Sequence, residues 1–482
     1  MTSDIKQESI KAILWSFIER FSHQILQIFF SIFLARILLP REFGLIAMTT
    51  VFVVIGNSFI NAGFGHALIQ KKNATIVDES SIFFFNLIIA FFVSLIFFSS
   101  SKFIANFYNE PQLIGIIKVL SLGLIFNAFG LVQRTLLSKI LDFKTQLKVS
   151  LTTSIISGAL AIYLALKGYG VWSLVALLLC TEFFNAFFLW VFCKWRPKFL
   201  LSLNSLKSMF GFGSKLFFIS VTNSIFTNIY LVVIGKLFSA SSLGFYYRAE
   251  TFYKYPVVLI NSVISQVSFP VFSKIQDDKP LLKNLLQKAI SYVTFLTFPL
   301  MIGLIVVANP LIEIVLTEKW LPSVPYLQLF CIIGMLYPIQ SINLNALNSL
   351  GRSDLYLKVD LLMKVLIVIT ILISYRFGIT IIILGQVINS FIAYYLYTYY
   401  VGKLLHYPLK SQLNDMYTNL ILSIVMGGLV YSLNFLNIEN QLLLLTFQIC
   451  SGVMTYFTLC YTLKIDLFIN LLSIIKNKSK SL

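Results

Sequence analysis

Fourteen apolar segments, separated by short polar intervals, are the feature of this sequence that most restricts its fold. A helix that crosses a bilayer needs about 20 largely apolar residues, and its backbone polar groups must be satisfied within the membrane. Only 12% of the residues are charged, against about 25% in soluble domains. The sequence therefore predicts an all-α polytopic membrane protein with about 14 transmembrane helices. The expected spans cover residues 12–36, 43–66, 80–100, 113–133, 147–166, 170–193, 212–238, 251–272, 287–309, 325–348, 357–376, 378–401, 416–436 and 441–462.

The distribution of basic residues predicts how these spans are oriented. If the N-terminus lies in the cytoplasm, 26 of the 37 Lys and Arg residues fall on the cytoplasmic side and 7 on the other side. Such an excess is typical of cytoplasmic loops, so we expect both termini to be cytoplasmic. The net charge of +18 is spread over many short loops, and we expect no nucleic-acid partner. The four remaining basic residues lie within or at the edges of spans: Arg20, Lys118, Arg248 and Lys254.

The first apolar segment, Ile13–Leu39, contains a polar stripe. Five polar residues recur at steps of three and four, and so share one helical face: Ser16, Arg20, His23, Gln27 and Ser31. A charge at the bilayer centre costs about 2.5–3.5 kcal/mol on insertion scales. A stripe that persists despite this cost normally faces the interior of a helix bundle or a water-filled path. The segment thus indicates that this membrane protein handles a charged group.

An internal repeat predicts two halves. Arg36 and Gly44 follow the first span, and Lys236 and Gly244 stand at the same offsets two hundred residues later. Six spans in each half would enter the membrane in the same sense, as in parallel repeats that hold a site between them. We therefore expect a six-helix lobe over residues 1–208, a second over 209–410, and two further helices with a basic tail over 411–482.

Cations and acids in or near spans are the candidate functional residues. The cations are Arg20, Lys215, Arg248 and Lys254, which suit an anionic substrate because Arg grips phosphate bidentately and Lys supplies a point charge. Arg20 could instead form an ion pair, and Arg248 and Lys254 could lie at the membrane interface. The neighbouring candidates for cavity tuning or ion coupling are Glu19, His23, Glu182 and Glu250. Among these, Glu182 has no local cation in the sequence to offset it.

Several classes of enzyme are disfavoured. The Gly211–Lys215 stretch lacks the spacing of a phosphate-cradling loop, and the three His residues are far apart in the sequence. The sequence predicts no catalytic residues, no metal site and no cofactor. A membrane polysaccharide polymerase or glycosyltransferase stays an alternative, but such enzymes usually carry a sizeable extramembrane loop, which we do not expect here.

Four stretches carry a resemblance to a known family. They are Leu34–Met48, Leu137–Leu174, Gly235–Pro256 and Phe269–Ser273, and together they extend over much of the chain. In order and spacing they are similar to the Wzx-type polysaccharide transporters, which are flippases for lipid-linked oligosaccharides. That family is a branch of the MOP superfamily, which also includes MATE multidrug exporters and the lipid II flippase.

The resemblance implies a two-lobed bundle with a cationic central cavity that works by alternating access. The implied substrate is an undecaprenyl-diphosphate-linked oligosaccharide that crosses the bacterial inner membrane for surface polysaccharide synthesis, such as O-antigen or capsule. Glu19-Arg20 and Arg248 stand where the lipid II flippase has cavity-lining residues. Implied partners are membrane lipids, a polysaccharide polymerase and a chain-length regulator. A cation-coupled multidrug exporter of the same superfamily is the alternative, although it would have a mainly acidic cavity.

Overall fold

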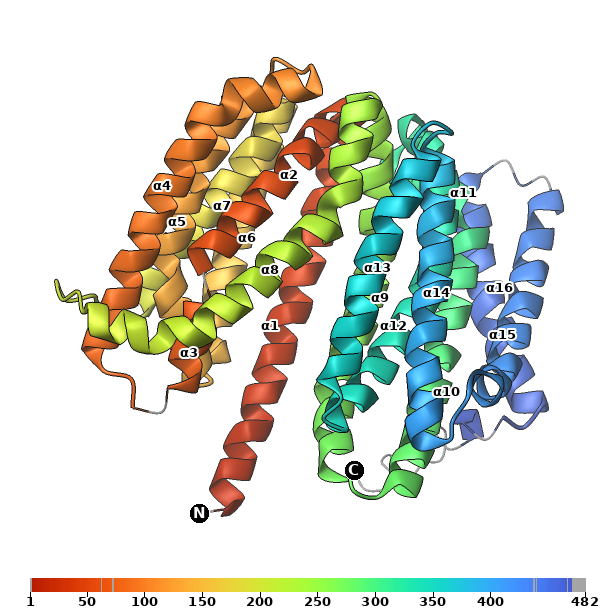
Figure 1. Ribbon diagram of the computed structural model, residues 1–482. Helices are drawn as coiled ribbons and strands as arrows, with labels where there is room; N and C mark the ends of the chain where they lie inside the picture. Colours follow the sequence, from red (N-terminus) through yellow and green to blue (C-terminus); the bar gives the residue numbers. More distant parts are fainter. Residues whose placement is uncertain are drawn as a thin grey trace. The chain divides into compact units, whose positions relative to one another are not determined.

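The computed structural model describes residues 2–61, 63–71, 73–436, 438, 440–465 and 467–469, with side chains from residue 14 onward except those of residues 66, 212 and 215. The regular structure of the described residues is entirely helical, without strands (Figure 1). It divides into two compact units, residues 1–247 and 248–482. The predicted partition into two lobes and a C-terminal pair stays a prediction.

The first unit is built from eight helices and the start of a ninth. They are α1 (Thr2–Ile37), α2 (Pro40–Asn61), α3 (Phe64–Gln70), α4 (Ile76–Tyr108), α5 (Leu113–Lys139), α6 (Phe143–Leu166), α7 (Val171–Phe192), α8 (Leu203–Leu237) and α9 (Ala240–Lys274). Helix α5 packs between α4 and α7, α6 packs between α1 and α7, and α8 packs along α2. The short helix α3 lies against α5 and α8.

The second unit contains the rest of α9 and the remaining helices. They are α10 (Lys279–Val306), α11 (Ala308–Leu316), the 3₁₀ helix η1 (Glu318–Ser323), α12 (Val324–Ser349), α13 (Ser353–Ser374), α14 (Ile379–Leu405), α15 (Leu409–Ser432), the 3₁₀ helix η2 (Leu433–Leu436) and α16 (Gln441–Thr462). Helix α12 packs between α10 and α14, and α15 packs between α10 and α16. A buried cluster around Met426, Val430 and Tyr456 joins this last pair to the body of the unit.

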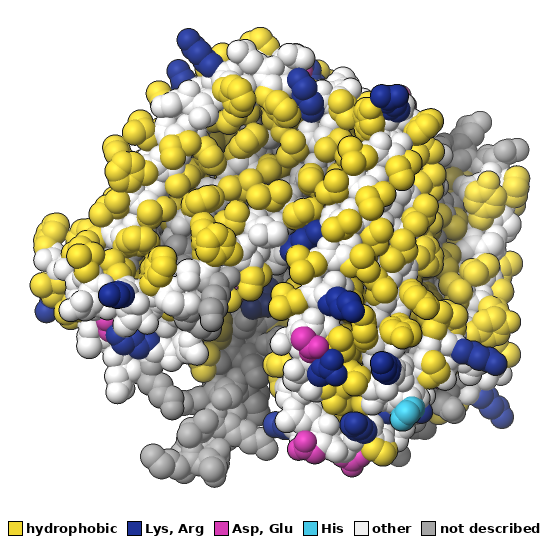
Figure 2. Space-filling view, viewed as in Figure 1, with side chains coloured by type: hydrophobic (Ala, Val, Ile, Leu, Met, Phe, Trp, Pro, Cys, Tyr) yellow, Lys and Arg dark blue, Asp and Glu magenta, His cyan; other side chains and the backbone are white. Residues whose placement is uncertain are grey.

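The helices confirm a polytopic all-α membrane protein. Each predicted span overlaps one long helix, and twelve helices of the described chain are long and apolar enough to cross a membrane. Helices α1 and α13 fall outside those limits, and both carry several charged residues, so the predicted number of fourteen is not confirmed. Large apolar side chains such as Phe92, Phe103 and Leu361 are exposed. Figure 2 shows hydrophobic side chains spread widely over the visible face, as expected of helices whose solvent is lipid.

The sequence repeat corresponds to a close contact within the first unit. Helix α1 ends at Ile37 and α2 begins at Pro40, and α8 ends at Leu237 and α9 begins at Ala240, which is the same interval. A Cβ on Gly44 would lie 1.7 Å from the Ala240 carbonyl oxygen, and one on Gly244 would lie 1.9 Å from the Pro40 carbonyl oxygen. The two repeat-related glycines thus let the starts of α2 and α9 touch backbone to backbone.

A buried amide pair connects α15 to the second unit. Gln412 and Asn343 exchange two hydrogen bonds of 3.1 Å, and the Thr398 hydroxyl donates to Gln412 over 3.2 Å. All three side chains have zero exposure. Because each amide satisfies the other, the pair can be buried without an unmet polar group.

We expect Gln412→Leu to destabilise the protein by about 1–2 kcal/mol, because Asn343 and Thr398 would lose their partner in an interior without water. Thermal unfolding of the purified protein measures this. The double variant Asn343→Leu/Gln412→Leu should lose less than the sum of the two single variants, because it leaves no amide unpaired. Asn414→Leu, on an exposed position of the same helix, is the matched control. Strict additivity would contradict the pairing.

Candidate functional site

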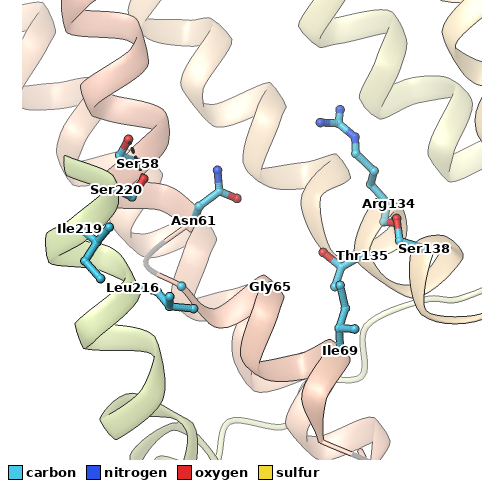
Figure 3. Close-up of a pocket in the computed structure, with 11 residues that line it drawn as sticks. Ser58, Asn61, Gly65, Ile69, Arg134, Thr135, Ser138, Leu216, Ile219 and Ser220 are labelled. Carbon is cyan, nitrogen blue, oxygen red and sulfur yellow. Dashed lines mark hydrogen bonds between the residues drawn. The ribbon is translucent and has the colours of Figure 1, made fainter. Parts of the chain in front are cut away.

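A cavity of about 440 Å³ lies within the first unit, among α2, α3, α5 and α8. Figure 3 shows Ser58 and Ser220 on one side of it and Arg134, Thr135 and Ser138 on the other, with Asn61 between them. Ile69, Leu216 and Ile219 form its apolar lining. Hydroxyls, an amide and a guanidinium thus share this lining with apolar side chains, in a membrane-spanning unit where polar groups are costly unless they serve a ligand or each other.

A glycine at the junction of α2 and α3 shapes this cavity. Gly63 has a positive φ of 72° and is the N-cap of α3, a conformation that residues with a Cβ rarely adopt. A Cβ there would also lie 2.3 Å from the Gly213 carbonyl oxygen of α8. The chain can therefore turn sharply after α2 and bring α3 against α8.

Serine hydroxyls join α2 to α8 at one wall. Ser58 Oγ lies 2.9 Å from Ser224 Oγ and accepts a hydrogen bond of 3.4 Å from Ser220. Small hydroxyl side chains allow two membrane helices to approach closely and bond across the interface. On this side of the cavity, α2 and α8 are therefore close together and linked by polar groups.

Among the described side chains that line the cavity, Arg134 is the one that carries a charge. Its Nη2 donates a hydrogen bond of 2.7 Å to Asn185 Oδ1 on α7. The guanidinium has five N–H donors, and the hydrogen bonds of the described residues use one of them. Arg134 also lies within electrostatic range of Glu19 and His23 on α1.

The span predicted from the sequence ends at residue 133, which places Arg134 among the basic residues of a cytoplasmic loop. The helix continues to Lys139, and this extra turn brings Arg134 inside the unit. A usable signal was present in the sequence, since Arg134 follows Asn127 by seven residues and so shares its helical face.

Helix α1 brings three of the predicted residues to this region. Arg20 is exposed, whereas Glu19 and His23 are half-buried. The Glu19 carboxylate lies close to Arg20, Arg134 and the Ser150 hydroxyl of α6. The predicted polar stripe thus meets a second cation, Arg134, that was not among the candidates.

The other predicted residues of the first unit are Glu182 and Lys215. The Glu182 carboxylate accepts a hydrogen bond of 2.9 Å from Asn127 Nδ2 on α5. The side chain of Lys215 lies outside the described residues, although its neighbour in α8, Leu216, lines the cavity.

The second unit holds the remaining three candidates. Arg248 is 1% exposed, and its Cζ lies 5.5 Å from the ring centroid of the buried Trp320, at cation–π distance. Lys254 forms an ion pair of 2.7 Å with Glu250 one turn away. The structure therefore brings Glu250 and Lys254 together, while Arg248 packs on an aromatic ring. Among the described residues, no group of three or more His, Cys, Asp or Glu side chains is placed to hold a metal ion.

Lys139 supports the cavity from the end of α5. Its Nζ donates to the carbonyl oxygens of Leu68 and Lys71, at 3.0 and 2.8 Å. These carbonyls end α3, where the last turn of a helix leaves acceptors without partners, and a cation there also suits the helix dipole.

We expect Lys139→Ala to lower the free energy of unfolding by about 1–3 kcal/mol, because two carbonyls lose a charged donor. The thermal unfolding midpoint of the purified protein checks this. Lys102→Ala, at an exposed position of α4, is the control and should change little. Equal effects of the two substitutions would show that the contacts of Lys139 add nothing.

The chain is similar in sequence to proteins of polysaccharide biosynthesis. A model of the family described as "Polysaccharide biosynthesis protein" matches residues 33–325. The teichuronic acid biosynthesis protein TuaB of Bacillus subtilis is 29% identical over 64% of this chain and 63% of its own length. The lipopolysaccharide biosynthesis protein WzxC of Escherichia coli is 28% identical over 75% of each chain. The chain thus spans somewhat less than two thirds of TuaB and three quarters of WzxC in these alignments.

The fold has a counterpart among solved structures. The lipid II flippase MurJ, in an inward closed conformation, superposes with a TM-score of 0.78 at 19% identity, over 94% of this chain and 99% of that one. At this identity the match concerns the fold, while the family model covers more than half of the chain. The resemblance seen in the sequence is confirmed: the chain belongs to the polysaccharide biosynthesis protein family.

Proposed function

We propose that the protein is a flippase that moves an undecaprenyl-diphosphate-linked oligosaccharide across a bacterial inner membrane by alternating access, for the synthesis of a surface polysaccharide. The observation that carries the proposal is the cavity of the first unit, where Arg134 stands among hydroxyls and an amide. The family and the fold shared with the flippase MurJ support it, as does the assignment of WzxC to lipopolysaccharide and of TuaB to teichuronic acid biosynthesis. A transporter of this kind is not an enzyme, since it leaves the bonds of its cargo unchanged.

The chemistry of the cavity suits the two polar parts of such a cargo. A diphosphate is an anion with many acceptor oxygens, which a guanidinium can meet with parallel N–H donors. Sugar hydroxyls both donate and accept, as do the serine and threonine hydroxyls of the lining. The lipid tail would stay in the bilayer, because its transfer into a polar cavity would be unfavourable.

The predicted cations have different positions in this proposal. Arg20 is exposed on α1, so it can meet a diphosphate without losing a buried contact, with Lys215 as a second cation on α8. Arg248 lies over Trp320 and Lys254 is paired with Glu250. Both stay proposed as diphosphate contacts, and each would have to leave its present partner. Glu19 and His23 would tune the charge around Arg20 and Arg134.

The orientation and partners belong to the same proposal. The excess of Lys and Arg in alternate loops supports cytoplasmic termini. A polymerase and a chain-length regulator would receive the flipped units on the far side of the membrane. A multidrug exporter is less well supported, because the lining carries Arg134 and no described acid.

The lipid-linked sugar pool of a deletion strain tests the function. We expect complete lipid-linked units to accumulate facing the cytoplasm while surface polymer is lost, and a plasmid copy to reverse both. A normal pool with unchanged polymer, in a strain without a second flippase, would contradict the proposal. Complete units that reach the outer leaflet unpolymerised would instead indicate a polymerase.

A further inference from the structure

A polar seam joins α5 to α7 inside the first unit. Asn127 donates to Glu182 over 2.9 Å, and Arg134 donates to Asn185 over 2.7 Å. Asn127 lies at the middle of α5 and Glu182 lies at the middle of α7. Both helices are apolar enough to span a membrane, so Glu182 is an ionisable group near the bilayer midplane. Such residues are costly, and they usually mark an ion or substrate path.

The basic side chains on the helices around α7 lie far from Glu182 along the helix axes. Helix α7 packs against α2, α5 and α6. Their charged side chains are Arg41, Glu42, Lys118, Arg134, Lys139, Lys144 and Lys148, and the other titratable side chains on these four helices are Tyr163 and Cys180. On α5, Arg134 and Lys118 are seven and nine residues from Asn127, which is about 10 and 13 Å along a helix. Among the described residues, no ion pair includes Glu182.

On α6 and α2 the charged side chains also lie near the helix ends. On α6, Ser157 accepts the hydroxyl of Thr181, the residue before Glu182, and Lys148 is nine residues away from Ser157. On α2, Glu42 lies at the N-cap of α7, where its Oε1 would be 2.4 Å from a Cβ on Gly170. Among the described residues, the side-chain hydrogen-bond partner of Glu182 is the uncharged amide of Asn127.

The same amide holds an unused acceptor. Asn127 Oδ1 is buried and has no hydrogen-bond partner among the described residues. It is bonded to the carbon that carries Nδ2, the atom that donates to Glu182, so it lies within a few ångströms of the carboxylate. Carboxylate and amide oxygens are ligands that small hard cations prefer. A protonated carboxyl could likewise donate to this oxygen after a rotation of the amide.

We propose that Glu182 and Asn127 form a binding site for one monovalent cation, a proton or a sodium ion, that neutralises the acid at the membrane midplane. This inference rests on the proposed function, because it supplies the ion that drives the flippase. The neutral site can move with its helices at lower cost than the charged one. Binding therefore favours one conformation of the unit over another by its difference in affinity for the two.

Ligand-dependent stability of the purified full chain tests the site without any sugar substrate. One series replaces choline by sodium at constant pH and ionic strength, and the other varies pH in choline alone. A ligand that binds only the folded state raises the unfolding midpoint. We expect the sodium response of the wild type to be lost in Glu182→Gln. The pH response has contributions from the other titrating groups as well, so we expect it to be smaller in Glu182→Gln than in the wild type. A rise with sodium that Glu182→Gln lacks identifies sodium, and a loss of pH response in Glu182→Gln without any sodium response identifies a proton.

Two further variants keep the test decisive. Glu182→Asp retains a carboxylate and should show a weaker response, and it replaces Glu182→Gln if that variant fails to fold. Glu313→Gln, an acid of α11 in the second unit, should keep the wild-type response. Equal responses of wild type and Glu182→Gln in both series would overturn the site. A normal lipid-linked pool in the deletion strain would instead overturn the flippase role and leave the binding result standing.

Discussion

Replacing Arg134 by alanine is expected to abolish export of the lipid-linked sugar while folded protein is still made. The substitution removes the positive charge that Arg134 brings to the described lining of the cavity, and it removes the hydrogen bond to Asn185. A diphosphate in the cavity would then lose a bidentate donor, and Glu19 would lose a neighbouring cation. The measurement is the surface polymer and the lipid-linked pool of a deletion strain that carries the variant.

A conservative variant separates charge from geometry. Arg134→Lys keeps a positive charge but loses the planar fork, so we expect partial export. Arg376→Ala, an exposed arginine that contacts Tyr375, is the matched control and should export normally. Full export by a stably expressed Arg134→Ala protein would remove the cavity from the transport path. A poorly expressed Arg134→Ala protein leaves Arg134→Lys as the variant to measure.

Gly44→Ala is expected to cause the largest loss of stability. The added methyl would sit 1.7 Å from the Ala240 carbonyl oxygen, and backbone atoms cannot rotate away as a side chain can. Overpacking of this kind costs about 1–3 kcal/mol or more, which exceeds the gain of about 1 kcal/mol from replacing Gly by Ala in a helix. The thermal unfolding midpoint should therefore fall.

The repeat supplies an internal check on that prediction. Gly244→Ala should have a similar effect, because its Cβ would meet the Pro40 carbonyl oxygen at 1.9 Å. Gly211→Ala is the matched control in the same unit, since a Cβ there meets no atom within 4 Å, and it should be neutral or stabilising. If all three substitutions behave alike, helix propensity and not the close approach decides the outcome.

The fold class could be predicted from the sequence because the bilayer imposes a simple requirement. A span needs about 20 apolar residues, and this length is visible locally. Each predicted span accordingly overlaps a helix. Helices α1 and α13 fall outside a limit set by apolarity because they carry charged residues. Within a membrane, contacts with other helices must compensate those residues.

The candidate site was predictable only in part. The stripe on α1 includes Arg20 and His23, and Glu19 stands next to Arg20; these residues could be noticed because a charge in an apolar segment is conspicuous by itself, but none of them lines the cavity. Arg134 was missed because helix ends are poorly determined by local sequence, and one additional turn decided whether it lay in a loop or in the cavity. Arg248 was recognisable as a cation near a span, but its burial against Trp320 depends on a segment some seventy residues away.

The sequence alone determined the class of protein and its helices, which follow from composition and local periodicity. It also showed the repeat, through matching residues two hundred positions apart, and the family, through the resemblance of four stretches to known members. The tertiary structure decided which polar groups meet: Arg134 with Asn185, Glu182 with Asn127, and Gly44 with the backbone of α9. The physical reason is that the free-energy cost of a charged side chain in a membrane, or of a glycine in a helix, depends on the groups that pack against it. Only the packing of the helices fixes those neighbours.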